Sequence, residues 1–383
     1  MEKKINICID FNKIAPLSRW HKDQWTDNLF KDDRFLYVKW DEFKQEGNNF
    51  LFLYCAPDET TEFLQSKTRN FFDTLKYKNI KILFWNEQFN LFMHDGDIFE
   101  YDHSVKNHCY DINNILYWKI LNIFKSHNIG EEMLYFIHSA KGFLDEIEQM
   151  KKRKILWINS TLDIKSKHLQ THDLLTWGKE QNVSTDIDPI YHYACLFSGR
   201  PAYHRHYLLK RLWDKGLLDF GKCSLTPLPD SQDTSNFDTF VPSFRGLPKT
   251  SHGPYGEDDI FKDIFVWIAG ETYCPNGYPY FTEKTVKPIM YKRPFISYGN
   301  PGTLAYLRDY GFKSFGNFWD ESYDDEKDDD KKIEMISNII QDVCKKNISE
   351  INKMYDDMRP ILEHNKNLLV NTDWRKDLVN FLS

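Results

Sequence analysis

The chain has 383 residues, 41% of them hydrophobic, which is more than one hydrophobic core usually organises, so the sequence predicts a folded protein of two domains. The net charge of −7 is carried by the segment at 320–330, which holds eight acids and one lysine, and the neutral remainder argues against a generally basic nucleic-acid-binding protein. No run approaches the roughly 20 apolar residues of a membrane span, and the opening MEKKINICIDFN lacks a signal-peptide core, so we expect a cytoplasmic protein without a membrane span. The seven cysteines form no C-x-x-C pair, so we expect neither a disulfide framework nor a zinc site.

The first part of the chain alternates strand-like and helix-like patterns. Apolar runs of strand length occur at 4–10, 35–40, 50–55, 80–85, 133–138 and 154–160. Helical periodicity occurs between them, at 60–77, 112–127 and 140–152. Strand and helix repeated in this way imply an α/β fold with a parallel sheet covered on both faces.

A second series of elements opens near residue 190. The expected elements are a strand in YHYACLFSG, a helix ending at Gly216, an irregular loop at 224–256, a strand at 263–271, a helix in TEKTVKPIMYK, a strand in RPFISYG and a helix in GTLAYLRDYG. The acidic stretch at 324–332 predicts a solvated, mobile loop, followed by a mostly helical C-terminus. We therefore expect an N-terminal domain at 1–188, a second αβ domain at 189–350, and helices at 351–383 that pack back on the first domain.

The tripeptide Thr282-Glu283-Lys284 interrupts apolar sequence at a predicted strand-to-helix turn. Thr282 is suited to cap the helix, which places Glu283 and Lys284 in the first turn, while Pro288 in the second turn would remove a backbone bond or kink the helix. A lysine there opposes the helix dipole, but a bound phosphate would be stabilised by both the ammonium and the free N–H groups. The alternative is that Glu283 and Lys284 form a solvated surface pair.

A second strand end of the same domain carries further donors. SGRPAYHRHYLL places Arg200, His204, Arg205 and His206 just after a strand, at the opening of a helix. Arginine can bind a diphosphate with two parallel hydrogen bonds. The alternative for His204 and His206 is a position on the helix surface.

The segment IFVWIAGETYCPNGYPYFTEKTVKPIMYKRPFISYG resembles the donor-binding segment of α1,3-fucosyltransferase-like enzymes of the GT-B type. KPIMYKRPFISYG, YGF at 310–312, WDESYD at 319–324 and GRPAYHRHYLLKRLWDKGLLD are similar to glycosyltransferase-like proteins of phages and large DNA viruses. The likeness covers about residues 190–325. It implies a GT-B fold, with two Rossmann-like domains facing across a cleft and C-terminal helices, and a location in the cytoplasm of the viral or host cell.

The resemblance also implies a donor site. Glu283 would bind the ribose of a nucleotide sugar, Lys284 and Arg205 would bind its diphosphate, and Glu271 stands where the family has a Glu near the donor. We add Thr282 and Arg200 to these candidates because of their places at the two strand ends. The chain has Ala-Gly-Glu-Thr where the fucosyltransferases have Phe-Glu-Asn-Ser, which leaves the nucleotide and the sugar open.

The predicted function is transfer of a sugar from a UDP- or GDP-sugar to a hydroxyl of a glycan or of a hydroxymethylated DNA base. No tightly bound cofactor is expected, and Lys, Arg and a helix N-terminus can stabilise the leaving diphosphate without a metal. The alternative is a non-catalytic protein that uses a GT-B scaffold to bind a glycan or another partner.

An inverting transfer also needs a general base from the first domain. Candidates at predicted strand ends are Asp10, Asp58, Glu59, Glu87 and His138. Glu87 and Asp10 are the two that we carry forward. The triplets Asp95-Gly96-Asp97 and Asp186-Ile187-Asp188 could suggest a metal-dependent enzyme, but neither follows a clean apolar strand, so no metal is predicted.

Overall fold

The structure is a computed structural model, and it describes residues 4–9, 30, 32–54, 63–86, 116–138, 165–168, 174, 183–185, 187–197, 203–225, 258–271, 279 and 281–383. Internal contacts divide the chain into two units: unit 1 is Met1–Thr176 with Asp373–Ser383, and unit 2 is Trp177–Thr372. The two units are groups of residues that contact one another, so the domain boundaries expected from the sequence stay a prediction. In the described ranges, no helix has both the length and the apolar character needed to cross a bilayer.

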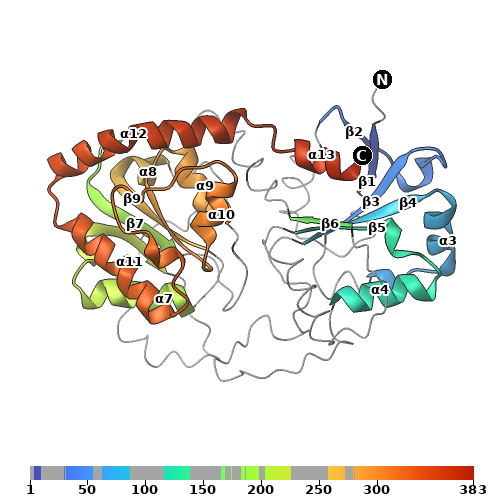
Figure 1. Cartoon of the computed structure of the whole chain (residues 1–383), viewed down its shortest axis with the longest axis horizontal. Coiled ribbons are helices and arrows are strands. Elements are labelled where there is room, and N and C mark those ends of the chain that lie inside the picture. Colours follow the sequence, from blue (N-terminus) through green and yellow to red (C-terminus); the bar gives the residue numbers. More distant parts are fainter. Residues whose placement is uncertain are drawn as a thin grey trace. The chain divides into compact units, whose positions relative to one another are not determined.

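Unit 1 contains a parallel sheet of six strands (Figure 1) in the order β2-β1-β3-β4-β5-β6. The strands are β1 Ile5–Cys8, β2 Phe35–Tyr37, β3 Asn48–Tyr54, β4 Ile80–Asn86, β5 Leu134–His138 and β6 Lys165–His168. Every neighbouring pair in this sheet is parallel. The chain reverses its direction of winding between β1 and β3, which makes this a doubly wound sheet with its switch point there. The prediction of mixed α/β structure with parallel sheets is confirmed.

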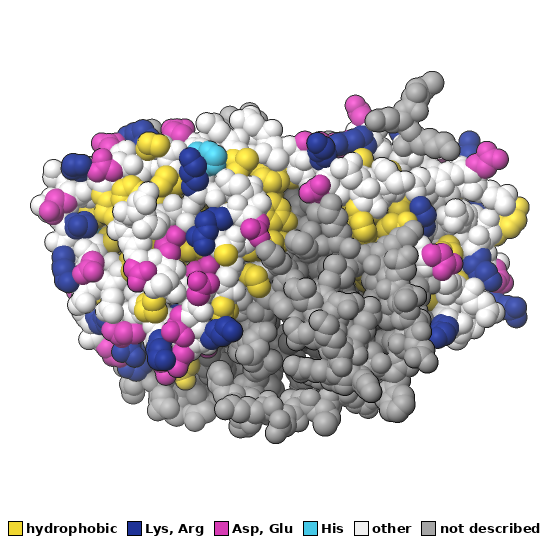
Figure 2. Space-filling model, viewed as in Figure 1, with side chains coloured by type: hydrophobic (Ala, Val, Ile, Leu, Met, Phe, Trp, Pro, Cys, Tyr) yellow, Lys and Arg dark blue, Asp and Glu magenta, His cyan; other side chains and the backbone are white. Residues whose placement is uncertain are grey.

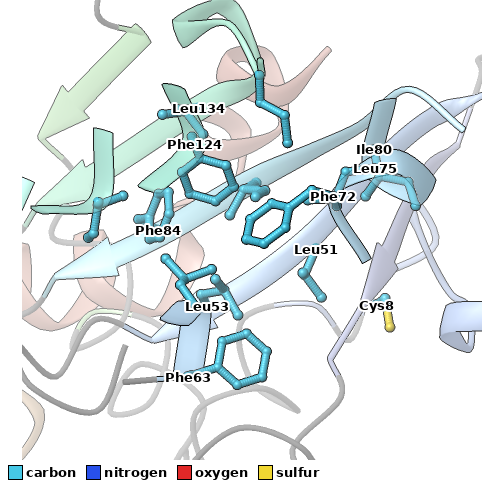
Figure 3. Packing of buried hydrophobic residues seen from close by; sticks show 14 of the residues in the cluster. Cys8, Leu51, Leu53, Phe63, Phe72, Leu75, Ile80, Phe84, Phe124 and Leu134 are labelled. Carbon is cyan, nitrogen blue, oxygen red and sulfur yellow. The ribbon is translucent and has the colours of Figure 1, made fainter. Parts of the chain in front are cut away.

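Both faces of the unit 1 sheet are buried, because its strands are apolar at successive positions. Leu51 of β3 faces α3 (Arg69–Tyr77) and α4 (Leu116–Ser126), whose Phe72 and Phe124 pack in the same cluster (Figure 3). Phe50 and Phe52, one residue to either side, belong to a cluster on the opposite face. Alternation along the strand thus supplies two cores. The second core includes side chains of α13 (Lys376–Leu382).

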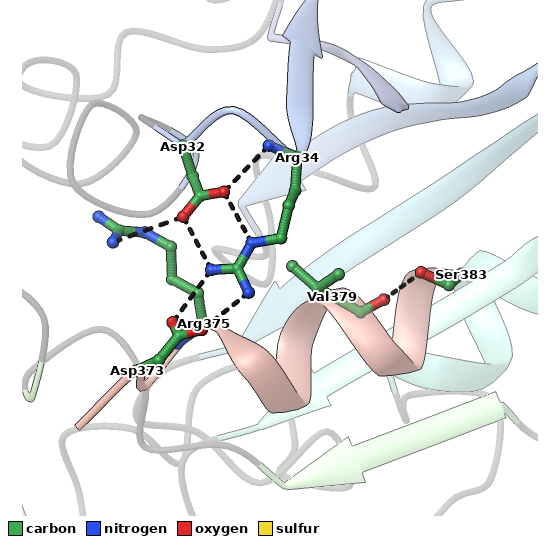
Figure 4. Close-up of polar contacts among 6 residues, drawn as sticks. All are labelled: Asp32, Arg34, Asp373, Arg375, Val379 and Ser383. Carbon is green, nitrogen blue, oxygen red and sulfur yellow. Dashed lines mark hydrogen bonds and ion pairs between the residues drawn. The ribbon is translucent and has the colours of Figure 1, made fainter. Parts of the chain in front are cut away.

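The last helix is held to unit 1 by ion pairs as well as by apolar contacts (Figure 4). Arg34 Nε lies 2.7 Å from Asp32 Oδ1, and Arg34 Nη1 lies 2.8 Å from Asp373 Oδ2, just before α13. Arg375 Nη1 is 4.0 Å from Asp32 Oδ2. The hydrogen bonds from Arg34 lower the pKa of Asp32 to about 2, against an opposing effect of burial.

Unit 2 contains a four-stranded parallel sheet in the order β10-β9-β7-β8. Its strands are β7 Tyr191–Phe197, β8 Gly221–Leu225, β9 Ile264–Gly270 and β10 Phe295–Tyr298. Its helices are α7 Tyr203–Asp214, α8 Asp258–Asp263, α9 Glu283–Met290, α10 Thr303–Asp309, α11 Asp329–Cys344 and α12 Ile348–Asn371. α11 packs with α7, and α12 packs with α9 (Figure 1). This sheet is also doubly wound, and its switch point lies between β7 and β9.

Acidic and basic side chains are interspersed on the face of unit 2 seen in Figure 2. The helices of unit 2 also carry exposed ion pairs one helical turn apart, such as Lys353 with Asp357 and Lys210 with Asp214. Exposed pairs of this kind add little to stability, so they keep the surface polar without fixing the fold.

Some predicted elements differ from the structure. The helix expected at 60–77 is interrupted at 66–68, because Ser66 Oγ donates to Phe63 O (2.7 Å) and Thr68 is extended as the N-cap of α3. β6 and β8 were not predicted, since KSKH and GKCSL are short and polar. The helix expected at 140–152, the strand expected at 154–160 and most of the loop at 224–256 lie outside the described residues.

Five of the nine residues predicted as a solvated, mobile loop at 324–332 are exposed, but α11 begins at Asp329 and both ends of the segment are buried. Asp324 is buried, and its carboxylate accepts hydrogen bonds from Leu304 N and Ala305 N at the start of α10. Lys332 is buried and donates to Gly299 O at 3.0 Å. Asp328 caps α11. Asp324 and Asp328 are ordered here because each accepts hydrogen bonds from a helix N-terminus.

Candidate functional site

The candidate site lies at the carboxyl edge of the unit 2 sheet. Glu271 directly follows β9, while α7 and α9 begin at 203 and 283 after β7 and β9. These two strands flank the switch point, where the crevice of a doubly wound sheet usually binds ligands. Helix N-termini gather at the same edge, so free N–H groups and positive dipole ends are available there.

α9 begins as the sequence predicts. Thr282 has an extended backbone with φ −123°, and its Oγ1 accepts a hydrogen bond from Lys284 N at 3.3 Å. Val286, Ile289 and Met290 are buried along one side of the helix. The cap and the apolar stripe therefore fix both the first residue of α9 and the face that it buries.

Pro288 lies inside α9, where it lacks the N–H that would bond to Lys284 O. The indole Nε1 of Trp267 on β9 donates to that carbonyl at 3.1 Å. The helix continues through Ile289 and Met290. The predicted loss of a backbone bond at Pro288 is therefore present, and a side chain of the sheet replaces the missing donor.

Glu271 is fully buried, and its carboxylate binds the start of α9. Oε1 accepts from Thr282 N at 3.0 Å and from Thr285 Oγ1 at 2.6 Å, while Oε2 accepts from Thr282 Oγ1 at 2.6 Å. Burial raises the pKa of Glu271, and the nearby ammonium of Lys284 opposes this shift. A buried carboxylate is stable only when hydrogen-bond donors replace the water that would otherwise solvate it. The hydrogen bonds of the Glu271 carboxylate therefore serve to hold the start of α9.

The backbone of Glu271 joins α9 to its neighbours. Its N–H donates to Tyr298 O at the end of β10 (2.8 Å), and its carbonyl accepts from His204 Nε2 (3.0 Å) and Arg205 Nη2 (3.2 Å) of α7. A Cβ at Gly299 would lie 3.2 Å from Glu271 Cβ, so a glycine permits this close approach. The ends of β9 and β10 and the start of α7 therefore meet at one residue.

His204, Arg205 and His206 are buried, so the alternative of histidines on the helix surface is wrong. Burial, followed by the charge of Arg205, lowers the pKa of His204 to about 3, and the ring is neutral near pH 7. Because a carbonyl can only accept, Nε2 carries the proton of the neutral ring. His204 and Arg205 face inward, where they donate to the Glu271 carbonyl.

Lys284 and Glu283 are partly exposed at the start of α9. Lys284 Nζ lies 2.8 Å from Glu283 Oε1 and 3.1 Å from Thr282 Oγ1, and 25% of the lysine side chain is exposed. Burial alone would raise the pKa of Glu283, but the ammonium groups of Lys284 and Lys287 lower it to about 2. The pair of Glu283 and Lys284 that the alternative interpretation predicts is present. It holds the Lys284 ammonium close to the N-terminus of α9.

The structure brings together five of the residues that the sequence singled out: Arg205, Glu271, Thr282, Glu283 and Lys284. Arg200, Glu87 and Asp10 lie outside the described residues, as do Asp58, Glu59, Asp95, Asp97 and Asp186. His138 ends β5. Among the side chains that the structure describes, no group of three or more potential ligands could hold a metal ion.

Sequence reasoning did not identify Thr285, Trp267 or Gly299 as parts of this site. Thr285 could have been found, because it lies one helical turn after the cap and shares its inward face. Trp267 gave no signal, since an indole in an apolar strand looks like core.

Comparisons with known proteins find structural neighbours of this chain, one of which is described here. No family model matches the chain. No curated protein matches it either. A structure of Phytolacca americana UGT2 complexed with UDP-2fluoro-glucose and pterostilbene is similar to 95% of this chain and 94% of that chain, at 9% identity and a TM-score of 0.29. At so low a score, the proposals below rest on this chain's own residues.

Proposed function

We propose that the carboxyl edge of the unit 2 sheet binds the diphosphate of a nucleotide sugar, and that the chain is a glycosyltransferase of the GT-B type. One observation carries the proposal: the ammonium of Lys284 is held over the start of α9, beside the switch point between β7 and β9. Phosphates bind at helix N-termini through N–H groups and the dipole, and a lysine there adds a full charge. A sugar nucleotide supplies the matching dianion.

In this proposal Lys284 exchanges Glu283 for the diphosphate when the donor binds. Glu283, released from that ion pair, is then able to accept hydrogen bonds from ribose hydroxyls. The charge that develops on the leaving diphosphate is stabilised by the ammonium and by the first-turn N–H groups, without a metal.

The proposal gives Arg205 and Glu271 a supporting role. Arg205 is buried and donates to the Glu271 carbonyl. The Glu271 carboxylate accepts three hydrogen bonds, two from Thr282 and one from Thr285. The family resemblance implies direct contacts with the donor for both residues. The hydrogen bonds of Arg205 and Glu271 favour a role in which both residues hold the start of α9 in position and do not contact the donor.

The acceptor in this proposal is a hydroxyl of a glycan or of a hydroxymethylated DNA base. Glu87 and Asp10 stay the candidates for the general base. A DNA acceptor requires a basic face. The chain outside the acidic segment at 320–330 has no net charge, which favours the glycan.

A second candidate function is a binding protein without catalysis. It is favoured by the pairing of Lys284 with Glu283 at 2.8 Å, which leaves no net positive charge on these two side chains. Hydrolysis of a sugar nucleotide by the purified protein separates the two functions, because a binding protein leaves the donor intact.

Titration calorimetry with UDP and with GDP tests donor binding. Loss of a charge-assisted hydrogen bond of about 1.5–3 kcal/mol should weaken binding by about tenfold or more in Lys284→Ala. Lys353→Ala is the matched control, because it also removes a lysine of unit 2 that pairs with a carboxylate at 2.7 Å. Absence of binding by either nucleotide to the unaltered protein would contradict the proposal.

A further inference from the structure

We propose that Glu271 is a positioning residue that holds the Lys284 ammonium in place through the hydroxyl of Thr282. What Lys284 binds rests on the function proposed above, whereas the positioning itself does not. The chain of contacts runs from a buried carboxylate, through one hydroxyl, to a partly exposed ammonium.

The direction of this chain follows from the single proton of the Thr282 hydroxyl. Its shortest contact is with Glu271 Oε2, at 2.6 Å, and a carboxylate can only accept. The hydroxyl therefore donates to Glu271. Its lone pairs are left to face Lys284 N at 3.3 Å and Lys284 Nζ at 3.1 Å, both of which are donors.

The position of Glu271 is fixed from several sides. Its carboxylate also binds Thr285, and its backbone binds α7 and β10 through hydrogen bonds of 2.8–3.2 Å. The charged and titratable groups that face it are Glu283 and Lys284 of α9, with His204 and Arg205 of α7. A carboxylate held in this way sets the orientation of the hydroxyl.

An amide in place of this carboxylate would reverse the chain. In Glu271→Gln the oxygen can still accept from Thr282 N and from Thr285, but the NH₂ group would point at Thr282 Oγ1 and donate to it. The Thr282 hydroxyl would then accept a hydrogen bond from the amide and donate its own proton to a different acceptor. One lone pair fewer would be left to accept from Lys284. The N-cap residue itself is unchanged, so this variant separates proton direction from loss of the cap.

Two threonine variants give a matched comparison. Thr282→Val and Thr285→Val each remove one hydroxyl that donates to Glu271 at 2.6 Å, but only the Thr282 hydroxyl also contacts Lys284. Thr282→Ser keeps the hydroxyl and should restore whatever Thr282→Val loses. This set remains informative if Glu271→Gln does not fold.

The first measurement needs no nucleotide. Competitive acetylation with acetic anhydride, read by peptide mass spectrometry, gives the reactivity of Lys284 relative to Lys353 in the same sample. Loss of one hydrogen bond of about 1 kcal/mol should raise the reactivity of Lys284 about fivefold in Glu271→Gln and Thr282→Val. Thr285→Val and Thr282→Ser should leave it within twofold of the starting value.

The second measurement is the Kd for UDP and GDP in the same variants. We expect binding about fivefold weaker in Glu271→Gln and Thr282→Val, with the affinity restored in Thr282→Ser. Equal changes in Thr282→Val and Thr285→Val, or an unchanged reactivity of Lys284 in Glu271→Gln, would overturn the positioning role. If the unaltered protein binds neither nucleotide, the proposed function fails, while the acetylation still decides the positioning.

Discussion

The carbonyl of Lys284 allows a sharp test of how α9 is stabilised. Pro288 removes its helical donor, and Trp267 Nε1 supplies a substitute at 3.1 Å. Trp267→Phe keeps an aromatic ring in the stack with Phe261 but removes the N–H. We expect it to destabilise the start of α9, because the carbonyl loses its donor.

The magnitude follows from a double-mutant cycle with Pro288→Ala. Trp267 is 5% exposed, so an unsatisfied carbonyl beside it should cost about 1–3 kcal/mol, in addition to the cost of the smaller ring. With alanine at 288, a backbone N–H is available to the Lys284 carbonyl. Trp267→Phe should then cost only the packing loss, so the coupling free energy equals the cost of the unsatisfied carbonyl, about 1–3 kcal/mol.

Native-state hydrogen exchange suits this measurement, because a chain of two units need not unfold in one step. The opening free energies of amides in α9 and β9 are compared in the four proteins of the cycle. If Trp267→Phe costs the same in both backgrounds, the indole acts by packing alone and the account of Pro288 is wrong.

Two further predictions concern a carboxylate of unit 1 and a glycine of unit 2. Asp32→Asn should destabilise unit 1 by about 2 kcal/mol near neutral pH, because the folded-state pKa of Asp32 is lowered from 3.8 to about 2. The difference in stability between the variant and the unaltered protein should shrink as the pH falls from 3.8 to about 2. Urea titrations that show a constant difference over this range would contradict the prediction. Gly299→Ala should lower thermal stability by about 1–3 kcal/mol, since the new Cβ lies 3.2 Å from Glu271 Cβ; an unchanged melting temperature would show that the strand end moves freely.

The predictable parts of the fold are those with a strong local pattern. β9 was predicted because all seven of its residues are apolar or small, and all are buried. β6 was missed because its sequence, KSKH, has no apolar side chain, and only pairing with β5 makes it a strand. The acidic run at 324–332 was misjudged because composition reports solvation, whereas capping depends on which helix starts nearby.

The predictable part of the site is also local. Thr282 as a cap follows from its neighbours, and the structure agrees. The role of Glu271 depends on contacts 11 and 66 residues away in sequence, with Thr282 and Arg205. Periodicity could not show that His204 lies inside, because the carbonyl that it binds belongs to another strand.

The two helix starts that follow β9 and β10 differ in what their N–H groups bind. At α10, the carboxylate of Asp324 accepts from Leu304 N and Ala305 N at 2.9–3.1 Å, so an anion from the protein already occupies that start. At α9, Thr282 offers Lys284 N a neutral hydroxyl at 3.3 Å, and the nearby Glu283 carboxylate is paired with the Lys284 ammonium. A carboxylate bound to the first-turn N–H groups takes the place of a phosphate and repels it, whereas the Lys284 ammonium adds a donor at α9. The electrostatics of this edge therefore favour α9 over α10 as the place where a diphosphate would bind.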